Sequence, residues 1–244
     1  MTVEWQEQCR FVLVGTSHAG NIGAAARAMK TMGIGNLDLV TPACEIDDQA
    51  LAMAAGARDV VESALVHDSL AAAVAESTLV IGLTARPRRD GVPALDPAGA
   101  ADCVLAERGS VSMLFGRERT GLTNDELASC HRLVHIPANP EYPSLNLAAA
   151  VQIMAYELYH RGSATVPSPA VASTAPGEPG ERPASGRHLE GLHAELAALV
   201  EWSGYAAGQP DAVLQRRLRN FINRARPSVD EVNLLRGILK RVHR

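Results

Sequence analysis

Three short stretches of the chain place polar and charged side chains where hydrophobic runs end. The stretches span residues 21–27, 114–122 and 136–147. They carry amide, guanidinium, carboxylate and hydroxyl groups on Asn21, Arg27, Glu118, Ser144 and Asn146. In an open parallel sheet, ligands bind in the crevice outside the carboxyl ends of the strands. The three stretches therefore predict one binding or catalytic site that is assembled from distant parts of the chain.

The first stretch has the pattern of a capped helix. Asn21 is the expected N-cap of that helix, because its side chain can accept a hydrogen bond from a free backbone N–H. Ile22 and Met29 share the buried face, so Arg27 is expected to point away from it. A solvated arginine without a function is the alternative interpretation of Arg27.

The second and third stretches suit contact with a ligand. Gly116 stands directly at a strand end, where the missing side chain allows close backbone approach; a charged turn is the alternative. In the third stretch, Pro140 and Pro143 stiffen the loop. Ser144 is the expected N-cap of the next helix, with Asn146 in its first turn.

The helix expected at about 145–161 is apolar nearly all round. A helix without a polar face is buried on every side. We expect the sheet of its own chain on one side and a second copy of the chain on the other. The sequence therefore predicts a homodimer.

The elements that position these stretches can be read from five apolar runs, rich in Val, Leu and Ile, that lack strict alternation. Such runs are typical of strands buried on both faces. They span 11–15, 37–41, 78–84, 110–116 and 133–137, and helices are expected at about 22–32, 48–56, 69–76, 96–106 and 123–129. The alternation of strand and helix predicts an α/β fold with a parallel sheet covered on both faces.

The 244 residues divide into a domain at 1–161, a linker at 162–186 and a helical extension at 187–244. The linker has five prolines and no aromatic residue, a composition that cannot bury a core and predicts mobility. The extension has the pattern of three amphipathic helices, at 187–202, 211–224 and about 228–242. It holds ten Arg and Lys against six Asp and Glu, whereas the rest holds 13 against 21. A basic tail on an acidic body favours a polyanionic partner.

The basic residues of the tail concentrate in one segment, 214–226, which contains no acid and includes Phe221. Its arginines are Arg216, Arg217, Arg219, Arg224 and Arg226. A solvated basic helix face is one interpretation. Contact with the phosphate backbone of a nucleic acid is the other.

Several other chemistries and locations are disfavoured. There is no G-x-S-x-G, P-loop or H-E-x-x-H motif, and no G-x-G-x-x-G after the first strand. His131 and His135 could share a strand face, but Cys130 alternates away from it, so we expect structural histidines and no metal. The four cysteines are widely spaced, which favours a reducing compartment. With no signal peptide and no apolar run of about 18 residues, we expect a cytoplasmic protein with no membrane partner.

Together the stretches resemble the SPOUT, or trefoil-knot, class of RNA methyltransferases that use S-adenosyl-L-methionine. Within that class the chain is similar to the TrmJ family of tRNA ribose 2′-O-methyltransferases. The matching residues are 16–23, 27–33, 114–124 and 138–150, and in the tail 224–227 and 234–239. The resemblance implies a C-terminal trefoil knot and a dimer with the cofactor in the knot at the subunit interface. It also implies a tRNA substrate, methylated on the pyrimidine at nucleotide 32 of the anticodon loop.

The resemblance also implies roles for single residues. The cofactor pocket would be formed by Leu83, Thr84, Ala85, Gly116, Ile136, Pro143, Ser144 and Leu145. Catalysis would involve Asn21, Arg27, Glu118, Ser144 and Asn146, with Arg27 supplied by the opposite subunit. The chain departs from some relatives at Gly15, where they carry an acid, and at Pro143, where they carry serine. A methyltransferase of ribosomal RNA and a non-catalytic knotted RNA-binding protein are the alternatives.

Overall fold

The computed structural model describes residues 5–85, 94–163, 182–205 and 211–242. A seven-stranded sheet in the order β3-β2-β1-β6-β4-β7-β5 forms its centre, and neighbouring strands pair in parallel throughout. The strands are β1 (Cys9–Val14), β2 (Leu37–Val40), β3 (Leu65–His67), β4 (Ser77–Leu83), β5 (Ala94–Leu95), β6 (Ser110–Phe115) and β7 (Arg132–Val134). The predicted parallel α/β sheet is confirmed.

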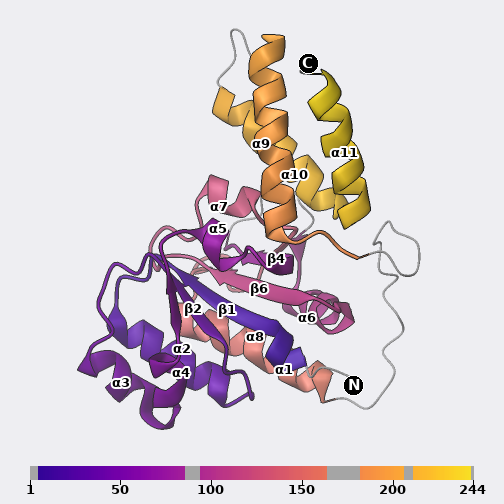
Figure 1. Cartoon of the computed structure of the whole chain (residues 1–244). Coiled ribbons are helices and arrows are strands. Elements are labelled where there is room, and N and C mark those ends of the chain that lie inside the picture. Colours follow the sequence, from indigo (N-terminus) through magenta and orange to yellow (C-terminus); the bar gives the residue numbers. More distant parts are fainter. Residues whose placement is uncertain (1–4, 86–93, 164–181, 206–210, 243–244) are drawn as a thin grey trace.

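Helices connect the strands and cover the sheet (Figure 1). They are α1 (Trp5–Gln8), α2 (Ala19–Lys30), α3 (Asp48–Ala54), α4 (Arg58–Glu62), α5 (Leu70–Ala73), α6 (Pro97–Ala106), α7 (Asn124–Ala128) and α8 (Leu147–Gly162), with a 3-10 turn at Ala55–Ala57. Among the described residues, no helix is long and apolar enough to cross a membrane.

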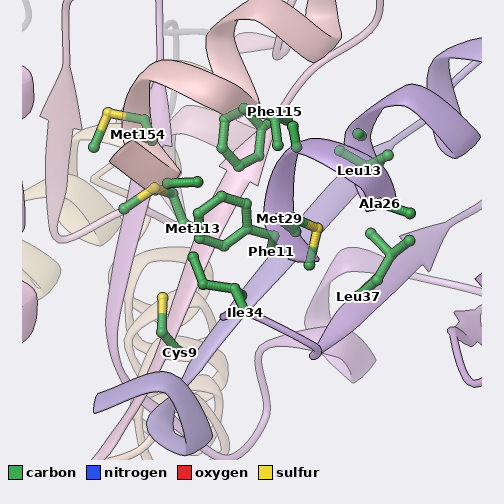
Figure 2. Packing of buried hydrophobic residues seen from close by; sticks show 14 of the residues in the cluster. Cys9, Phe11, Leu13, Ala26, Met29, Ile34, Leu37, Met113, Phe115 and Met154 are labelled. Atoms are coloured by element: carbon green, nitrogen blue, oxygen red, sulfur yellow. The ribbon is translucent and has the colours of Figure 1, made fainter. Parts of the chain in front are cut away.

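The larger hydrophobic core lies between one face of the sheet and helices α2, α3, α6 and α8. Phe11 of β1 and Phe115 of β6 pack with ring centroids 5.1 Å apart. Met29 of α2 lies beside Phe11, and Met154 of α8 belongs to the same cluster (Figure 2). Because α2 and α8 pack on the same face of the sheet, the loops that lead into these two helices are held near one another.

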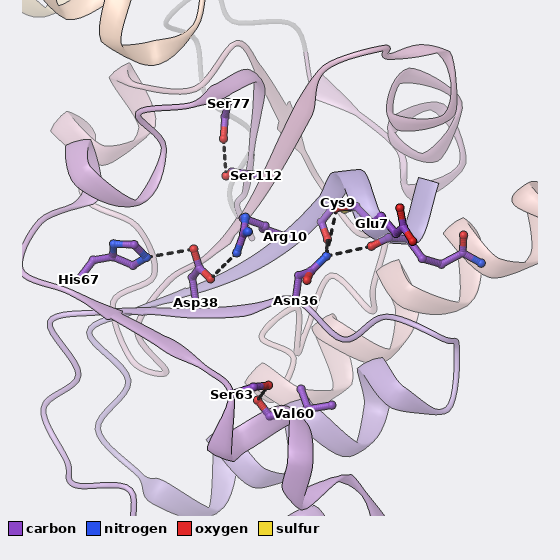
Figure 3. A network of polar contacts seen from close by, with 11 residues as sticks. Glu7, Cys9, Arg10, Asn36, Asp38, Val60, Ser63, His67, Ser77 and Ser112 are labelled. Carbon is purple, nitrogen blue, oxygen red and sulfur yellow. Dashed lines mark hydrogen bonds and ion pairs between the residues drawn. The ribbon is translucent and has the colours of Figure 1, made fainter. Parts of the chain in front are cut away.

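The opposite face of the sheet is apolar only in part. Val12, Val80 and Leu114 pack beneath α5 and α7. Beyond them lies a polar network (Figure 3) in which the buried Asp38 binds Arg10 at 3.1 Å and His67 at 3.0 Å. Since a buried carboxylate is costly without partners, this network fastens β1, β2 and β3 together.

A three-helix bundle follows the α/β domain in the chain. It consists of α9 (Gly186–Ser203), α10 (Asp211–Ala225) and α11 (Val229–Val242). Leu189, Leu192, Ile222, Val232 and Leu239 are prominent in its own small core. The bundle stands on the side of the sheet that carries α5 and α7 (Figure 1). The three predicted tail helices are thus present, and they form a separate hydrophobic unit.

The bundle is docked on the α/β domain through polar contacts. Arg226 pairs with Glu107. Asn223 donates to the Ala128 carbonyl at 2.8 Å, and the Arg187 backbone N–H donates to the Ala75 carbonyl at 2.9 Å. Most of the predicted linker, 164–181, lies outside the described residues. Its final part is packed, because the Arg182 carbonyl accepts from Val229 and Ala184 is buried.

Candidate active site

The loop after β1 leads directly into the site. Gly15 has a φ of +62°, a left-handed conformation that suits glycine, and the chain turns there from β1 towards α2. Helix α2 begins at Ala19, with His18 as N-cap. The prediction that Asn21 caps this helix is wrong. Asn21 lies inside the first turn, and its side chain bonds to a residue of another loop instead.

That residue is Glu118, from the loop after β6. Its carboxylate accepts hydrogen bonds from Asn21 Nδ2 at 2.9 Å and from the Ser17 hydroxyl at 3.0 Å. The Ser17 backbone N–H donates to both carboxylate oxygens at 3.2 Å. His18 Nδ1 lies 3.7 Å from Glu118 and 2.8 Å from the Ser17 hydroxyl. The first and second stretches are therefore joined, as predicted, through one shared carboxylate.

The environment of Glu118 keeps the carboxylate ionised. Partial burial raises its pKa, but the hydrogen bonds from Asn21, from its own loop backbone and from Ser17 outweigh burial, so the pKa lies below its usual value. A carboxylate that accepts several donors is stabilised in its charged form. Glu118 is thereby suited to hold Ser17 and Asn21 in place.

Asn146 brings the third stretch to the same point. Its Nδ2 donates to Asn21 Oδ1 at 3.4 Å, and its own Oδ1 accepts from the Ala148 N–H at 2.9 Å. Asn146 is therefore the N-cap of α8, and the prediction that Ser144 is the cap is wrong. Ser144 is exposed two residues earlier in the loop. Because the helix starts at Leu147, the side-chain amide of Asn146 can cap it through Oδ1 and still donate to Asn21 through Nδ2.

The turn at 116–122 explains why Gly116 is a glycine. A Cβ there would lie 2.3 Å from the backbone of Gly121 and Leu122, so no residue with a side chain fits at this position of the turn. Arg117 forms two hydrogen bonds of 3.0 Å with Glu126. A Cβ on Gly15 would meet the Arg117 side chain at 2.6 Å. The fold of its own loop therefore requires a glycine at 116, and the predicted contact of Gly116 with a ligand stays a prediction.

The residues expected to hold a cofactor follow three neighbouring strands. Strand β4 pairs with β6 and with β7, and Leu83 is level with Val134. The Thr84 N–H donates to the Val134 carbonyl at 2.9 Å, so the two loop starts run together. Of the residues expected to hold the cofactor, five are half-buried: Leu83, Thr84, Gly116, Ile136 and Leu145. The other three, Ala85, Pro143 and Ser144, are exposed. Small and apolar side chains at adjacent strand ends fit a planar, partly apolar ligand.

Arg27 lies apart from the Glu118 cluster. It is exposed on α2, about 9 Å along the helix axis from Asn21 and about 120° around it. Within the described residues it makes no hydrogen bond or ion pair with a side chain. The prediction that Arg27 points away from the buried face is confirmed. Within one protomer, the structure does not bring it together with Asn21, Glu118 and Asn146.

The five arginines of the segment 214–226 fall into two groups. Arg219 pairs with Glu190 of α9, Arg226 pairs with Glu107, and Arg216 lies 3.9 Å from Asp125. These three bind acidic side chains of the protein itself. Arg217 and Arg224 are exposed on α10. The predicted basic surface is therefore narrower than the sequence indicates.

Two polar residues that lie outside the three predicted stretches also reach Glu118. Ser17 and His18 contact Glu118 directly, and their position straight after β1, beside the first stretch, was the available signal. The histidines near β7 have other roles. His131 accepts from the Val80 N–H at 2.9 Å, and His135 lies 3.2 Å from the Thr84 carbonyl. Each imidazole therefore has a hydrogen-bond partner in β4 or directly after it.

Comparison with known proteins gives matches along most of the chain. The SpoU rRNA Methylase family profile matches residues 8–156, and the profile of the tRNA methyltransferase TrmJ C-terminal domain matches 187–244. The tRNA (cytidine/uridine-2′-O-)-methyltransferase TrmJ of Sodalis glossinidius is 45% identical, over 94% of this chain and 89% of its own length. The protein of the same name from Cronobacter sakazakii is 45% identical over 96% and 95%. The crystal structure of TrmJ from Z. mobilis ZM4 superposes with a TM-score of 0.85 at 32% identity, covering 96% of this chain and 99% of that one.

Proposed function

The chain belongs to the SpoU methylase family and, within it, to the TrmJ tRNA 2′-O-methyltransferases, and from this premise we propose that it methylates the ribose of the pyrimidine at nucleotide 32 of tRNA. The observation that carries the proposal is that both the α/β domain and the bundle match the same group of tRNA enzymes. Because tRNA is a cytoplasmic substrate, the proposal agrees with the reducing compartment expected from the cysteines.

The methyl donor in this proposal is S-adenosyl-L-methionine, which supplies a methyl group on a positively charged sulfur. The half-buried small and apolar residues at the ends of β4, β6 and β7 support such a ligand, since pockets for small molecules are lined mainly by apolar side chains. Leu83, Thr84, Gly116, Ile136 and Leu145 would hold it, with Ala85, Pro143 and Ser144 at the rim. The trefoil knot implied by the family resemblance belongs to the same proposal.

Glu118 acts in this proposal as a positioning residue. Its acceptor positions are occupied by Ser17 and Asn21, and its lowered pKa makes it a weak proton acceptor. A carboxylate in that state fixes the loop after β1 and the start of α2. Asn146 extends the same chain of hydrogen bonds to α8.

Arg27 is proposed to act on the substrate in a homodimer, from the subunit opposite the bound cofactor. Its guanidinium does not readily lose a proton, so a clamp on a phosphate and on the developing oxyanion suits it better than the role of base. The dimer is supported by α8, where Tyr156 and Tyr159 are 50% and 46% exposed in the single chain. Exposed tyrosines on a mostly apolar helix favour an interface.

Ribosomal RNA is the second candidate substrate, and the description of the matched SpoU family favours it. The bundle favours tRNA, because its matching profile is that of a tRNA enzyme. Labelled methyl transfer from S-adenosyl-L-methionine to purified tRNA and to ribosomal RNA distinguishes the two. A tRNA with deoxyribose at nucleotide 32 should accept no methyl group, whereas deoxyribose at nucleotide 34 should change nothing. Equal methylation of the nucleotide 32 variant would overturn the assignment of the position.

A further inference from the structure

One face of helix α10 combines exposed cationic and aromatic side chains. Arg217, Phe221 and Arg224 follow each other at intervals of four and three residues, so they project within about 60° of one another. Both arginines are exposed, and the Phe221 side chain is 59% exposed. Val213, one turn before Arg217, is 37% exposed on the same face. An exposed phenylalanine on a helix that has a buried face available calls for an explanation.

The opposite side of α10 shows that this orientation is fixed by the bundle. Ile222 is buried in the bundle core, and Asn223 is held by His193 Nε2 at 3.1 Å and by the Ala128 carbonyl at 2.8 Å. Arg219 is engaged with Glu190. The helix therefore cannot rotate to hide Phe221 without breaking contacts to both the bundle and α7.

The position of α10 relates this face to the active-site loop. Arg216 lies 3.9 Å from Asp125 in the first turn of α7, and Asn223 contacts the last residue of the same helix. Helix α7 begins six residues after Glu118. The exposed stripe of α10, formed by Arg217, Phe221 and Arg224, therefore belongs to a helix that packs against α7, which continues the loop of the Glu118 cluster.

The chemistry of the stripe specifies its ligand. Arginine favours a phosphate, and the open ring of Phe221 offers a stacking surface for a flat base, which every nucleotide supplies. A base inside a duplex has both faces covered by the neighbouring base pairs, so the ring of Phe221 selects an unpaired nucleotide. We propose that Arg217 and Phe221 bind an unpaired nucleotide of the substrate tRNA, with its phosphate on Arg217 and its base on Phe221. This inference rests on the proposed function as a tRNA methyltransferase.

The test compares ring, bulk and charge at these two positions, by tRNA binding measured with fluorescence anisotropy. Phe221→Ala and Phe221→Leu should both weaken tRNA binding, by about five-fold to more than a hundred-fold. Phe221→Tyr keeps the aromatic ring and should bind tRNA like the wild type. The slope of affinity against salt concentration should stay unchanged in the Phe221 variants and fall by about one unit in Arg217→Ala. The unfolding temperature of each variant checks that the exposed substitutions leave the fold intact.

The possible outcomes separate this inference from the proposed function. If wild-type protein methylates tRNA but Phe221→Ala binds it equally well, the stacking site is wrong and the function stands. If Phe221→Leu binds like wild type, the contact is apolar and the stacking is refuted. If Phe221→Ala instead converts a dimer to a monomer in sedimentation, the stripe joins copies of the chain. If wild-type protein neither binds nor methylates tRNA, the proposed function itself fails.

Discussion

Asn21 donates a hydrogen bond from its side-chain amide to Glu118 at 2.9 Å, although 97 positions separate the two residues. The carbonyl oxygen of the same amide accepts from Asn146 at 3.4 Å. Asn21 is therefore the central link between the three polar stretches. An amide suits this place because it can donate to a carboxylate and accept from a second amide at the same time.

This double role predicts that Asn21→Asp is more harmful than Asn21→Ala. Alanine leaves Glu118 short of one donor, a loss of about 1–3 kcal/mol in the free energy of unfolding. Aspartate places a second carboxylate against Glu118, which repels it while both are ionised. Urea unfolding at pH 7 should rank wild type above Asn21→Ala and Asn21→Asp last. At pH 4 the gap between the two variants should narrow, because one carboxyl becomes protonated; a constant gap contradicts the assigned contact.

The close packing of α2 on α3 predicts a contrast between two glycines of one helix. A Cβ on Gly23 would lie 1.9 Å from the Ala50 carbonyl oxygen, whereas one on Gly20 would meet only side-chain atoms, the nearest at 3.4 Å. Gly23→Ala should therefore lower the free energy of unfolding by about 3 kcal/mol or more. Gly20→Ala should leave it unchanged or raise it by up to about 1 kcal/mol, since alanine favours the helix. Thermal unfolding of the pair gives the comparison, and equal effects would show that α2 and α3 are not in close contact.

The sequence predicted the buried part of the fold better than its edges. Strands such as β1 and β6 are continuous apolar runs, so their pattern is unambiguous. Strands β3 and β5 were missed because they have only three and two residues and lie at the two edges of the sheet. A short, half-exposed edge strand has no apolar run to detect. Helices α1 and α4, of four and five residues, were missed for the same reason of length.

The approach of Asn21, Glu118 and Asn146 was predicted from the sequence, but the local roles of these residues were not. Helix-capping propensity alone favours Asn21 and Ser144 as caps. It does not show that a carboxylate from another loop lies next to Asn21. The bond to Glu118 draws Asn21 into the helix interior, and Asn146 takes the capping role that Ser144 was given. The pairing of Arg219 and Arg226 with acids elsewhere in the chain was equally hidden. Partners distant in sequence decide such roles, and a periodic pattern does not record them.

The buried His131 predicts a loss of stability in mild acid. Burial and the nearby positive charges of Arg226 and Arg132 lower its pKa to about 3, from about 6.5 in an unfolded chain. Between these values the unfolded chain binds a proton that the folded protein does not. The free energy of unfolding should therefore fall, as pH decreases from 6.5 towards 3, by about 1.4 kcal/mol per pH unit from this group.

The measurement for His131 compares wild type with His131→Asn, which keeps an acceptor for the Val80 N–H. Urea unfolding at pH 6.5 and pH 5 should show a smaller loss in the variant, by about 2 kcal/mol. Other groups, including His193, whose pKa burial also lowers, contribute equally to both proteins and cancel. Identical losses in the two proteins would mean that His131 is not protected from protonation.

Arg27 predicts a separation between cofactor binding and turnover. It is exposed on α2 and is not one of the residues that are expected to hold the cofactor. Arg27→Ala should therefore leave the affinity for S-adenosyl-L-methionine nearly unchanged in a calorimetric titration, while methyl transfer to tRNA is abolished. Arg27→Lys keeps the charge without the planar fork, so it should retain only partial activity. Loss of cofactor binding in either variant would refute the clamp.

Arg226 and Arg217 lie in one basic segment, only nine positions apart, but their substitution should have different effects. Loss of Arg226 should loosen the bundle, whereas loss of Arg217 should weaken tRNA binding. Arg226 joins the bundle to Glu107, whose side chain is only 6% exposed, so Arg226→Ala leaves a nearly buried carboxylate without its counter-charge. Removing one partner of such a pair costs about 3 kcal/mol or more. Hydrogen exchange in α7 and α10 should become faster in Arg226→Ala, because the bundle is held less firmly.

Arg217→Ala is the matched control for Arg226→Ala, since Arg217 is exposed and makes no ion pair within the described residues. It should leave hydrogen exchange unchanged, because no contact to the α/β domain is lost. Its effect should instead be on tRNA affinity. If Arg226→Ala weakens tRNA binding without any change in exchange, Arg226 contacts RNA directly and the ion pair with Glu107 does not hold the two units together. Faster exchange in Arg226→Ala alone assigns docking to Arg226 and leaves RNA contact to the exposed face of α10.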